Sequence, residues 1–597
     1  MPNENRNWIA FIVVAGLIFL TYQIFIVGPQ AKLAAERHKA QEAAAAIAPA
    51  ATAPTALTHG QALGRSPRVV IDTPSLQGSL ALRGARIDDL LLKGYHVDVA
   101  KTSPLVRLLT PEGETDAYFV QQSWLGANLP GLPDDQTLWT QTSSGPLTPE
   151  HPVVLTYQAP SGLTFTRTIA VDPKAMFTIT DTVANQGAAP VTLTPFNAVQ
   201  RVGLPDALSK SHGAFEGAIG VLGTDSYHLR LTSYKNWKKG KVDDDGKWSS
   251  TGGWLGITDK YWMAAFVPEQ HEHIDTRLRT MQDATGAEIY ESAYLGAPRA
   301  IAPGARITEV SHVFAGAKTV PLLNAYKKSM GIPQFENAVD WGWVWFLTKP
   351  IFILLEFFYQ HVGNFGVAIL MLTVVIRLIT FPLANRGFEM GVKMKKIQPE
   401  LQALQKKYKD DPTAQQKEMM ALYAREKVNP VTGCLPVLFQ IPVFYSLTNL
   451  FTVTIEMRHA PFFGWIHDLS ARDPTTIMNL FGLIPWDPAM TPLIGGILGG
   501  ALHIGVWPIA YGLSMWLSQS MTPTQGIDPT QQMLFKFMPI MFTFILAQYA
   551  VGLLIYWTWS SLITILQQYV MMRRFKVDNP IDSFFARFSA AKPETSG

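Results

Sequence analysis

Cysteine, charge and recognisable catalytic motifs are all scarce in this chain of 597 residues. Its single cysteine is Cys434, so the chain can form neither a disulfide framework nor a cysteine-based zinc site. Charged residues make up only 16% of the chain, below the roughly 25% that is typical of soluble domains. The net charge of +3 is too small to indicate nucleic-acid binding. These shortages favour a membrane protein that carries a large soluble part.

Signatures of bound cofactors and of covalent catalysis are also missing. The sequence has no P-loop, no HExxH zinc motif, no GxSxG motif and no Cys–His pair. His271 and His273 could offer two metal ligands, but their polar neighbours and Pro268 favour a solvated turn. We therefore expect no cofactor, no metal site and no enzymatic activity.

One apolar stretch, residues 367–382, is hydrophobic enough to cross a bilayer and yet contains Arg377. Burying an arginine in hydrocarbon costs roughly 2.5–3.5 kcal/mol on insertion scales, so such a residue needs a reason to be there. Thr373 lies one turn earlier on the same helical face. Two interpretations stay open. Arg377 faces a wet cavity that receives an acidic substrate, or it snorkels into the lipid headgroups.

The first half of the chain divides into three parts. Residues 1–30 predict a transmembrane anchor rather than a cleaved signal peptide, because charged residues precede the first alanine-rich stretch. Residues 31–65 are rich in alanine, proline and threonine, which predicts a flexible linker. Residues 66–332 contain short alternating runs separated by turn residues, which predicts a large all-β sandwich.

Residues 335–362 are aromatic and amphipathic, and we expect a helix lying on the outer membrane surface. Residues 363–572 are predicted to be a five-helix membrane core that includes a helical hairpin at 387–427. Apolar residues on the first arm of the hairpin repeat like a coiled-coil seam. They are Met390, Met394, Ile397, Leu401, Leu404 and Tyr408. Thr413 is expected to cap the second arm, whose partner face is predicted to be Met419, Met420 and Tyr423.

The many lysines and arginines of the hairpin place it in the cytoplasm. Its basic face is either a solvated surface near anionic lipid or a docking site for a partner or an incoming chain. The remaining spans are predicted at 436–454, about 499–519, 534–548 and 553–572. With the anchor, the sequence predicts six transmembrane helices, both termini in the cytoplasm and the sandwich outside. Residues 573–597 form a tail with no strong pattern.

Polar residues in these spans are candidates to line one cavity together with Arg377. Gln440 interrupts the first turns of its span, which is tolerated where a helix borders a cavity. Ser561, Thr564 and Gln568 share one face of the last span. Ordinary hydrogen bonding between helices is the other explanation for these three residues. Glycines at 495, 496, 499 and 500 favour close helix packing near the third span.

The pattern argues against several classes of membrane protein. A pump would carry paired ionisable groups in mid-membrane, and a channel would show rings or repeats; the sequence has neither. A polar groove with a lone arginine beside a basic hairpin suits a device that moves an apolar segment with a few acidic residues into lipid. The alternative is a membrane-anchored assembly factor that acts mainly through its β-sandwich.

Over nearly its whole length, the chain resembles the YidC/Oxa1/Alb3 family of membrane insertases. The matching runs include Asp340–Phe346, Val362–Gly366, Lys427–Pro430, Gln440–Pro442, Trp465–Ser470 and Phe537–Pro539. The resemblance implies a bacterial inner-membrane protein with a galactose-mutarotase-like periplasmic domain. It also implies an insertase and chaperone for newly made membrane proteins, which works alone or with the Sec translocon and contacts ribosomes.

The resemblance also implies roles for particular residues. In the family, the arginine here numbered Arg377 engages acidic client residues, and Thr373, Tyr556 and Trp557 lie along the client path. Trp557 stands where enterobacterial members have a second tyrosine, and the larger ring would narrow that path. The tail is short and weakly basic, which weakens the expectation that the ribosome binds through it.

Overall fold

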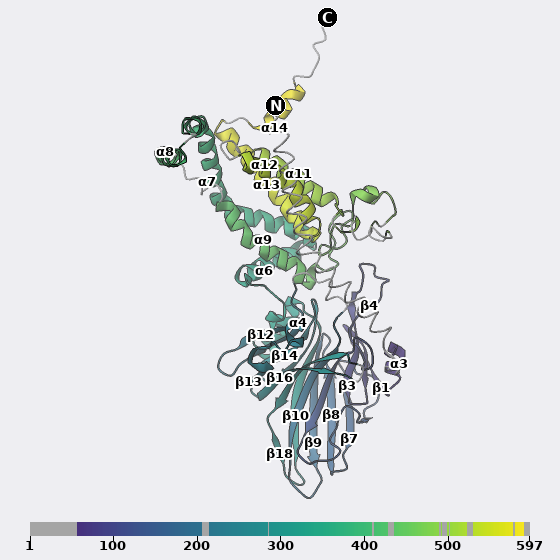
Figure 1. The fold of residues 1–597 in the computed structure, drawn as a ribbon. Helices are drawn as coiled ribbons and strands as arrows, with labels where there is room; N and C mark the ends of the chain where they lie inside the picture. The colour runs from purple at the N-terminus through teal and green to yellow at the C-terminus, as the bar shows by residue number, and fades with distance from the viewer. Residues whose placement is uncertain are drawn as a thin grey trace, which may run out of the picture. The chain divides into compact units, whose positions relative to one another are not determined.

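The computed structural model describes most of the chain from residue 56 onward. The residues described are 56–205, 214–283, 286–408, 411–427, 435–486, 488, 491, 498–500, 502–521, 529–576 and 579–589. The predicted anchor at 1–30 and most of the predicted linker at 31–65 lie outside these ranges. The described residues form two antiparallel β-sheets followed by a series of helices (Figure 1).

The sheets confirm the all-β fold predicted for the first half of the chain. In order, the first sheet contains β1 (Arg68–Asp72), β2 (Leu76–Ala81), β3 (Arg86–His96), β5 (Tyr118–Leu125), β10 (Val191–Val202), β17 (Glu288–Gly296), β16 (His273–Gln282) and β13 (Lys247–Thr251), with β4 (Leu105–Leu109) beside β3 and β18 (Arg299–Ile301) beside β10. The second contains β12 (His228–Ser233), β11 (Gly217–Leu222), β14 (Trp254–Thr258), β15 (Trp262–Pro268), β19 (Arg306–Ala317), β9 (Met176–Asn185), β8 (Leu163–Val171), β7 (Val153–Gln158) and β6 (Thr140–Gln141).

The hydrophobic core of this domain follows from the alternation of its strands. Every second residue of β8 is buried, as a strand with one face on a core requires. Large aromatic side chains fill the core, among them Trp139, Phe165, Phe177 and Phe266. A hydrogen bond also ties the two sheets. Arg167 of β8 makes two 2.7 Å contacts with the carboxylate of Asp181, which also accepts a 2.9 Å bond from the indole of Trp124 in β5.

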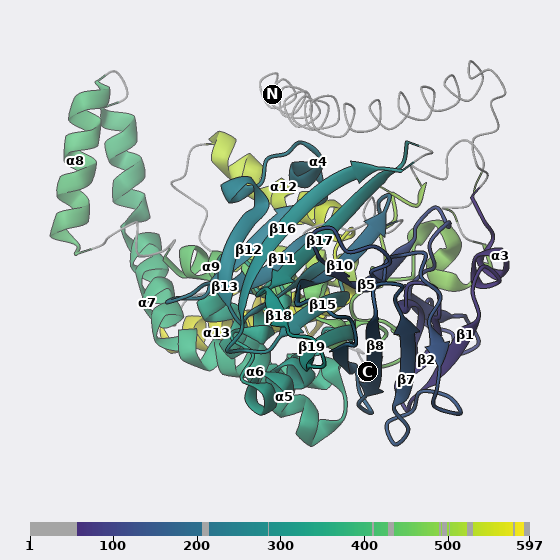
Figure 2. The same ribbon diagram turned by 90° about the horizontal axis from the view of Figure 1, so that it is seen from below.

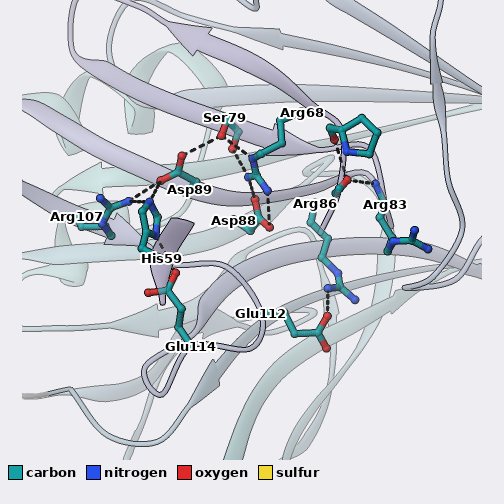
Figure 3. Close-up of polar contacts among 12 residues, drawn as sticks. His59, Arg68, Ser79, Arg83, Arg86, Asp88, Asp89, Arg107, Glu112 and Glu114 are labelled. Atoms are coloured by element: carbon teal, nitrogen blue, oxygen red, sulfur yellow. Dashed lines mark hydrogen bonds and ion pairs between the residues drawn. The ribbon is translucent and has the colours of Figure 1, made fainter. Parts of the chain in front are cut away.

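The N-terminal edge of the domain is held by ionic contacts (Figure 3). The short helix α3 (His59–Leu63) precedes β1. The imidazole Nδ1 of His59 lies 2.8 Å from the carboxylate of Glu114, and Arg107 bridges the His59 ring and Asp89. These contacts fasten α3 to the sheet, so the domain includes residues that precede the predicted boundary at 66.

Helices make up most of the described chain after β19. They are α5 (Val320–Met330), α6 (Trp345–Val362), α7 (Phe365–Lys407), α8 (Pro412–Arg425), α9 (Leu435–Val453), α11 (Val506–Ser520), α12 (Pro529–Leu546), α13 (Val551–Arg574) and α14 (Pro580–Ser589). The shorter helical turns are α4 (Tyr234–Lys238), η3 (Asp243–Gly246), η4 (Phe335–Ala338), η6 (Ile455–Met457) and η7 (Ile477–Gly482). Within the described ranges, only Phe365–Gly391 is by itself long and apolar enough to span a bilayer, so the count of six spans stays a prediction.

The predicted hairpin exists, but its details differ. Helix α7 continues through Pro382, so the first span and the first arm of the hairpin form one helix. Helix α8 runs beside the C-terminal part of α7 (Figure 2), where Ile397 and Leu401 are buried as predicted. On α8, Leu422 is buried and the predicted Met419 and Tyr423 are half-buried, whereas the predicted Met420 is 62% exposed. Met420 falls on the outer side because two adjacent residues of a helix point about 100° apart.

The predicted N-cap of α8, Thr413, is wrong. The carboxylate of Asp411 accepts the backbone N–H groups of Thr413 and Ala414, at 3.1 and 3.0 Å. Asp411, and not Thr413, is therefore the N-cap. An aspartate that precedes a proline at the first helical position is a favoured start signal, because the proline has no N–H to satisfy.

The span predicted at about 499–519 is the helix α11, which begins only at Val506. Gly499 and Gly500 lie in a turn outside α11, so they are not its packing glycines. Their carbonyl groups accept hydrogen bonds from Arg472 and Gln548, at 3.1 and 2.7 Å. The helix starts where the buried carboxylate of Asp473 accepts the N–H of Trp507 at 2.8 Å.

Two other boundaries differ from the predictions. The surface helix expected from 335 begins at Trp345, after Gly342 adopts a left-handed φ of 70°. The tail, predicted to lack a pattern, contains α14.

Candidate functional site

The charge that stands out in the sequence, Arg377, lies where α7 packs against α13. Its guanidinium Nε donates a 2.7 Å hydrogen bond to the hydroxyl oxygen of Ser560 on α13, and a second guanidinium nitrogen contacts the same oxygen. The side chain is half-buried. Among the residues that the structure describes, no carboxylate pairs with it.

Aromatic and polar side chains from two other helices surround this contact. Tyr556, one turn before Ser560 on α13, is fully buried, and its phenol accepts a 3.4 Å hydrogen bond from Gln440 of α9. The phenols of Tyr511 on α11 and of Tyr556 lie within electrostatic range of the guanidinium. Four helices, α7, α9, α11 and α13, therefore contribute side chains to the environment of Arg377. We call Arg377, Gln440, Tyr511, Tyr556 and Ser560 the arginine cluster.

The other predicted site residues fall into different places. Thr373 is fully buried, and its hydroxyl donates a 2.7 Å bond to the carbonyl of Ile369 in its own helix. The ring of Trp557 packs against Phe444 and Tyr511, with centroids 4.9 and 5.1 Å apart. Trp557 therefore supports the aromatic side of the cluster.

On α13, Arg377 contacts a serine that lies next to the predicted Ser561. The residue that binds Arg377 is Ser560, whereas Ser561 is half-buried beside it. Thr564 donates to the carbonyl of Ser560 at 2.9 Å, and Gln568 accepts a 3.3 Å bond from Ser518 of α11. The spacing of Tyr556, Ser560 and Thr564 at four-residue intervals was the sequence signal that could have identified Ser560.

A second polar contact between α7 and α13 was missed altogether. Gln567 of α13 donates a 2.6 Å hydrogen bond to the side-chain oxygen of Asn385 on α7, two turns beyond Arg377. Both side chains are half-buried. The two helices are thus joined by a pair of polar contacts, Arg377–Ser560 and Asn385–Gln567. No spacing rule links residues on separate segments, so the sequence carried no signal for this pairing.

Next to Arg377, the side of α7 that faces away from the other helices is apolar and exposed. Leu378 and Ile379, the two residues that follow Arg377, are 65% and 70% exposed. On α13, Leu562, Leu566 and Val570 are also exposed. Large apolar side chains that stay exposed at this density are expected where lipid replaces water. The arginine therefore points into the helix bundle from a helix whose other side is suited to lipid.

The arrangement can bind an anion without acid–base or metal chemistry. A guanidinium carries five N–H donors in a planar fork, and the single hydroxyl of Ser560 accepts only part of them. Carboxylates match that fork in a bidentate geometry. In the described ranges, no cluster of three histidine, cysteine or acidic side chains could hold a metal ion.

Two family models match consecutive parts of the chain. The model described as the YidC periplasmic domain matches residues 68–354. The model described as the 60Kd inner membrane protein matches residues 357–579, which includes the whole arginine cluster. The boundary between the two falls inside α6.

Curated relatives match over almost the full length. The membrane protein insertase YidC of Caulobacter vibrioides is 51% identical, with 98% of each chain covered. The protein of the same name from Nitrobacter hamburgensis is 44% identical, covering 99% of this chain and 100% of the relative. Among solved structures, a galactose mutarotase-like protein from Lactobacillus casei covers 42% of this chain and 100% of its own, at 10% identity and a TM-score of 0.27.

Proposed function

The chain belongs to the family of YidC membrane protein insertases, and on that premise we propose that the arginine cluster holds the polar part of a client during insertion. An insertase of this family is an inner-membrane protein with a periplasmic β domain, and its clients are newly made membrane proteins. It is not an enzyme. The observation that carries the proposal is the half-buried guanidinium of Arg377, whose partner is a neutral hydroxyl.

The proposed step is an exchange of partners at Arg377. A client carboxylate that enters the cluster takes the guanidinium donors that Ser560 leaves open. An acidic residue at the centre of a membrane helix costs roughly 2.5–3.5 kcal/mol on insertion scales. An ion pair at about 4 Å gains roughly 1 kcal/mol in water and roughly 4 kcal/mol near a protein surface. Pairing in the half-buried cluster therefore offsets most of that cost, whereas pairing in bulk water does not.

The apolar part of the client leaves by a different route. The exposed residues of α7 and α13 suit contact with lipid, so a client helix can pass sideways into the bilayer along them. Burial of apolar surface contributes about 25 cal/mol per Å², which supplies the driving force without a nucleotide. Gln440 and Tyr556 stay on the polar side, and Thr373, Trp557, Ser561, Thr564 and Gln568 remain candidates along the path.

The topology that goes with this mechanism has six transmembrane helices, with both termini in the cytoplasm. The spans are the anchor near residues 8–27 and the helices α7, α9, α11, α12 and α13. Helix α6 lies at the periplasmic surface, a position supported by the exposed side chains of Trp345 and Phe346 in its first turn and of Trp343 just before it. The basic α7–α8 hairpin receives the client on the cytoplasmic side, where it contacts the ribosome, and the protein works alone or with the Sec translocon.

Insertion into proteoliposomes tests the proposal most directly. We would compare the wild type, Arg377→Ala and Arg377→Lys, each with a client whose translocated tail is acidic and with the same client after its acids are neutralised. Arg377→Ala should slow the acidic client by roughly tenfold or more, because one lost charge-assisted contact is worth about 1.5–3 kcal/mol. Arg377→Lys should restore part of the rate, because it keeps the charge without the planar fork.

The neutralised client serves as the control for folding. It should be inserted equally well by all three proteins. If Arg377→Ala impairs both clients equally, the arginine supports the structure and does not attract acidic residues. If neither client is affected, the insertion path lies elsewhere.

A further inference from the structure

The helix α14 (Pro580–Ser589) contributes no residue to the arginine cluster, and its first turn contacts the end of α13. The carboxylate of Asp582 accepts hydrogen bonds from the phenol of Tyr569 at 3.0 Å and from Arg573 at 3.2 Å. Asn579, just before the helix, donates to the same carboxylate at 2.8 Å. The first turn of α14 is therefore folded back onto the last turns of α13.

Apolar packing fixes the same turn. Ile581 packs against a small cluster of buried residues, Met521, Ile565 and Met572, where α11 and α13 end. Ile581, Phe584 and Phe585 share one face of α14, because residues three and four apart are neighbours on a helix. Ile581 is half-buried, whereas Phe584 and Phe585 are 57% and 65% exposed. The apolar face of α14 therefore packs on the protein at Ile581 and is exposed at Phe584 and Phe585.

The charge near this face is net positive, because Arg573, Arg574, Lys576 and Arg587 outnumber Asp578 and Asp582 in residues 573–589. Arg573 pairs with Asp582, so the acidic residue of α14 is neutralised. Arg574 and Lys576 are exposed in the segment that leads into α14. The last exposed apolar residue of α13, Val570, lies one turn before Arg573. Two exposed aromatic rings beside two exposed cations, directly after a lipid-suited helix, match the headgroup region of an anionic bilayer.

We propose that α14 is a surface anchor that inserts Phe584 and Phe585 into the headgroup region of anionic lipid where α13 leaves the membrane. Asp582 is the positioning residue, because it turns α14 back toward the bilayer plane. Arg574 and Lys576 supply the attraction to lipid phosphates. The anchor requires that α13 spans the membrane, but it is independent of the arginine cluster.

Hydrogen exchange of the full-length protein tests the anchor. Amide exchange at residues 580–589 is compared in detergent, in phosphatidylcholine vesicles and in phosphatidylcholine vesicles that contain phosphatidylglycerol. We expect slower exchange in the vesicles, and slowest with phosphatidylglycerol. The double variant Phe584→Ser/Phe585→Ser should lose the protection in both kinds of vesicle. Arg574→Gln/Lys576→Gln should lose only the part that depends on phosphatidylglycerol, and Ser583→Ala is the matched control that should keep all of it.

Two results would overturn the anchor. Equal exchange in detergent and in both vesicles would mean that the contacts of Asp582 and Ile581 alone hold the helix. Protection that appears only when ribosomes are added would mean that the aromatic face binds the ribosome. Because this exchange measurement uses no client, its result does not depend on the proposed role of the arginine cluster.

Discussion

The guanidinium Nε of Arg377 lies 2.7 Å from the hydroxyl oxygen of Ser560, so a charge on an apolar helix is held by a neutral group on another helix. A carboxylate in that position would form a closed ion pair and would compete with an acidic client. A hydroxyl orients the guanidinium and still leaves donors open. Because its partner is a hydroxyl and not a carboxylate, Arg377 can still bind the carboxylate of a client.

Removing that hydroxyl should weaken the insertion of acidic clients. In Ser560→Ala the guanidinium loses its orienting acceptor, and we expect a several-fold slower insertion, since such a bond contributes about 1–1.5 kcal/mol. Ser520→Ala, an exposed serine at the end of α11 whose hydroxyl donates to the carbonyl of Leu517, is the matched control and should insert the same client at the wild-type rate. A loss in both variants, or in Ser520→Ala alone, would contradict the assignment of Ser560.

The contact between Asn385 and Gln567 should stabilise the pairing of α7 with α13. Asn385→Ala and Gln567→Ala are each expected to lower the melting temperature in detergent. In a double-mutant cycle, the coupling between the two should be about 0.5–1 kcal/mol, which is typical of hydrogen bonds between membrane helices. Gln568→Ala serves as the control for the cycle. Because Gln568 accepts a hydrogen bond from Ser518 of α11, this variant should show no coupling to Asn385→Ala. Additive losses for Asn385 and Gln567 would show that the bond does not couple the helices.

Close packing of α11 on α12 depends on Gly512. A Cβ at this position would collide with the hydroxyl of Thr543, which donates a 2.8 Å bond to the carbonyl of Pro539. Gly512→Ala is therefore expected to destabilise the protein by about 1–3 kcal/mol, the usual range for overpacking. Thr543→Ala should largely rescue it. Gly391→Ala on α7 meets no atom within 4 Å and should be neutral or slightly stabilising. A stable Gly512→Ala would mean that the helices are not in contact here.

One carboxyl group predicts a pH dependence of stability. The carboxylate of Glu456 in η6 accepts a 2.9 Å hydrogen bond from the N–H of Val320, the first residue of α5. Burial raises the pKa of Glu456 from 4.5 to about 7. Between pH 4.5 and about 7, the carboxyl group of Glu456 is therefore protonated more often in the folded state than in the unfolded state. The stabilisation is complete below about pH 4.5 and is lost as the pH rises through about 7.

The amide exchange of Val320, corrected for the intrinsic effect of pH, measures this loss. We expect opening to become easier from pH 5 to 8, by about 2 kcal/mol once partial solvent access to the half-buried side chain is allowed for. Glu456→Gln keeps an acceptor but cannot titrate, so its corrected exchange should be independent of pH. The same pH dependence in Glu456→Gln would assign the effect to another group.

Patterns within single segments predicted much of the fold. Alternation in strands such as β9 and β19 predicted the all-β domain, and the apolar repeat around Ile397 predicted the hairpin. These features are local, because burial on one face imposes a period of two on a strand and about 3.6 on a helix. The candidate site was also found by a local anomaly, the charge of Arg377 in an apolar run. Its family was recognisable from short motifs in the same way.

The sequence by itself determined that Arg377 needs a polar environment, because the cost of burying its charge is intrinsic to the side chain. Only the tertiary structure decided which groups provide it. Ser560 and Ser561 are adjacent in sequence but point about 100° apart on a helix, so a small error in helical phase selects the wrong serine. The pairing of Asn385 with Gln567 and the folding back of α14 through Asp582 join segments whose relative position no local pattern contains. Such contacts depend on how whole helices pack, and helix packing is set by all of their side chains together.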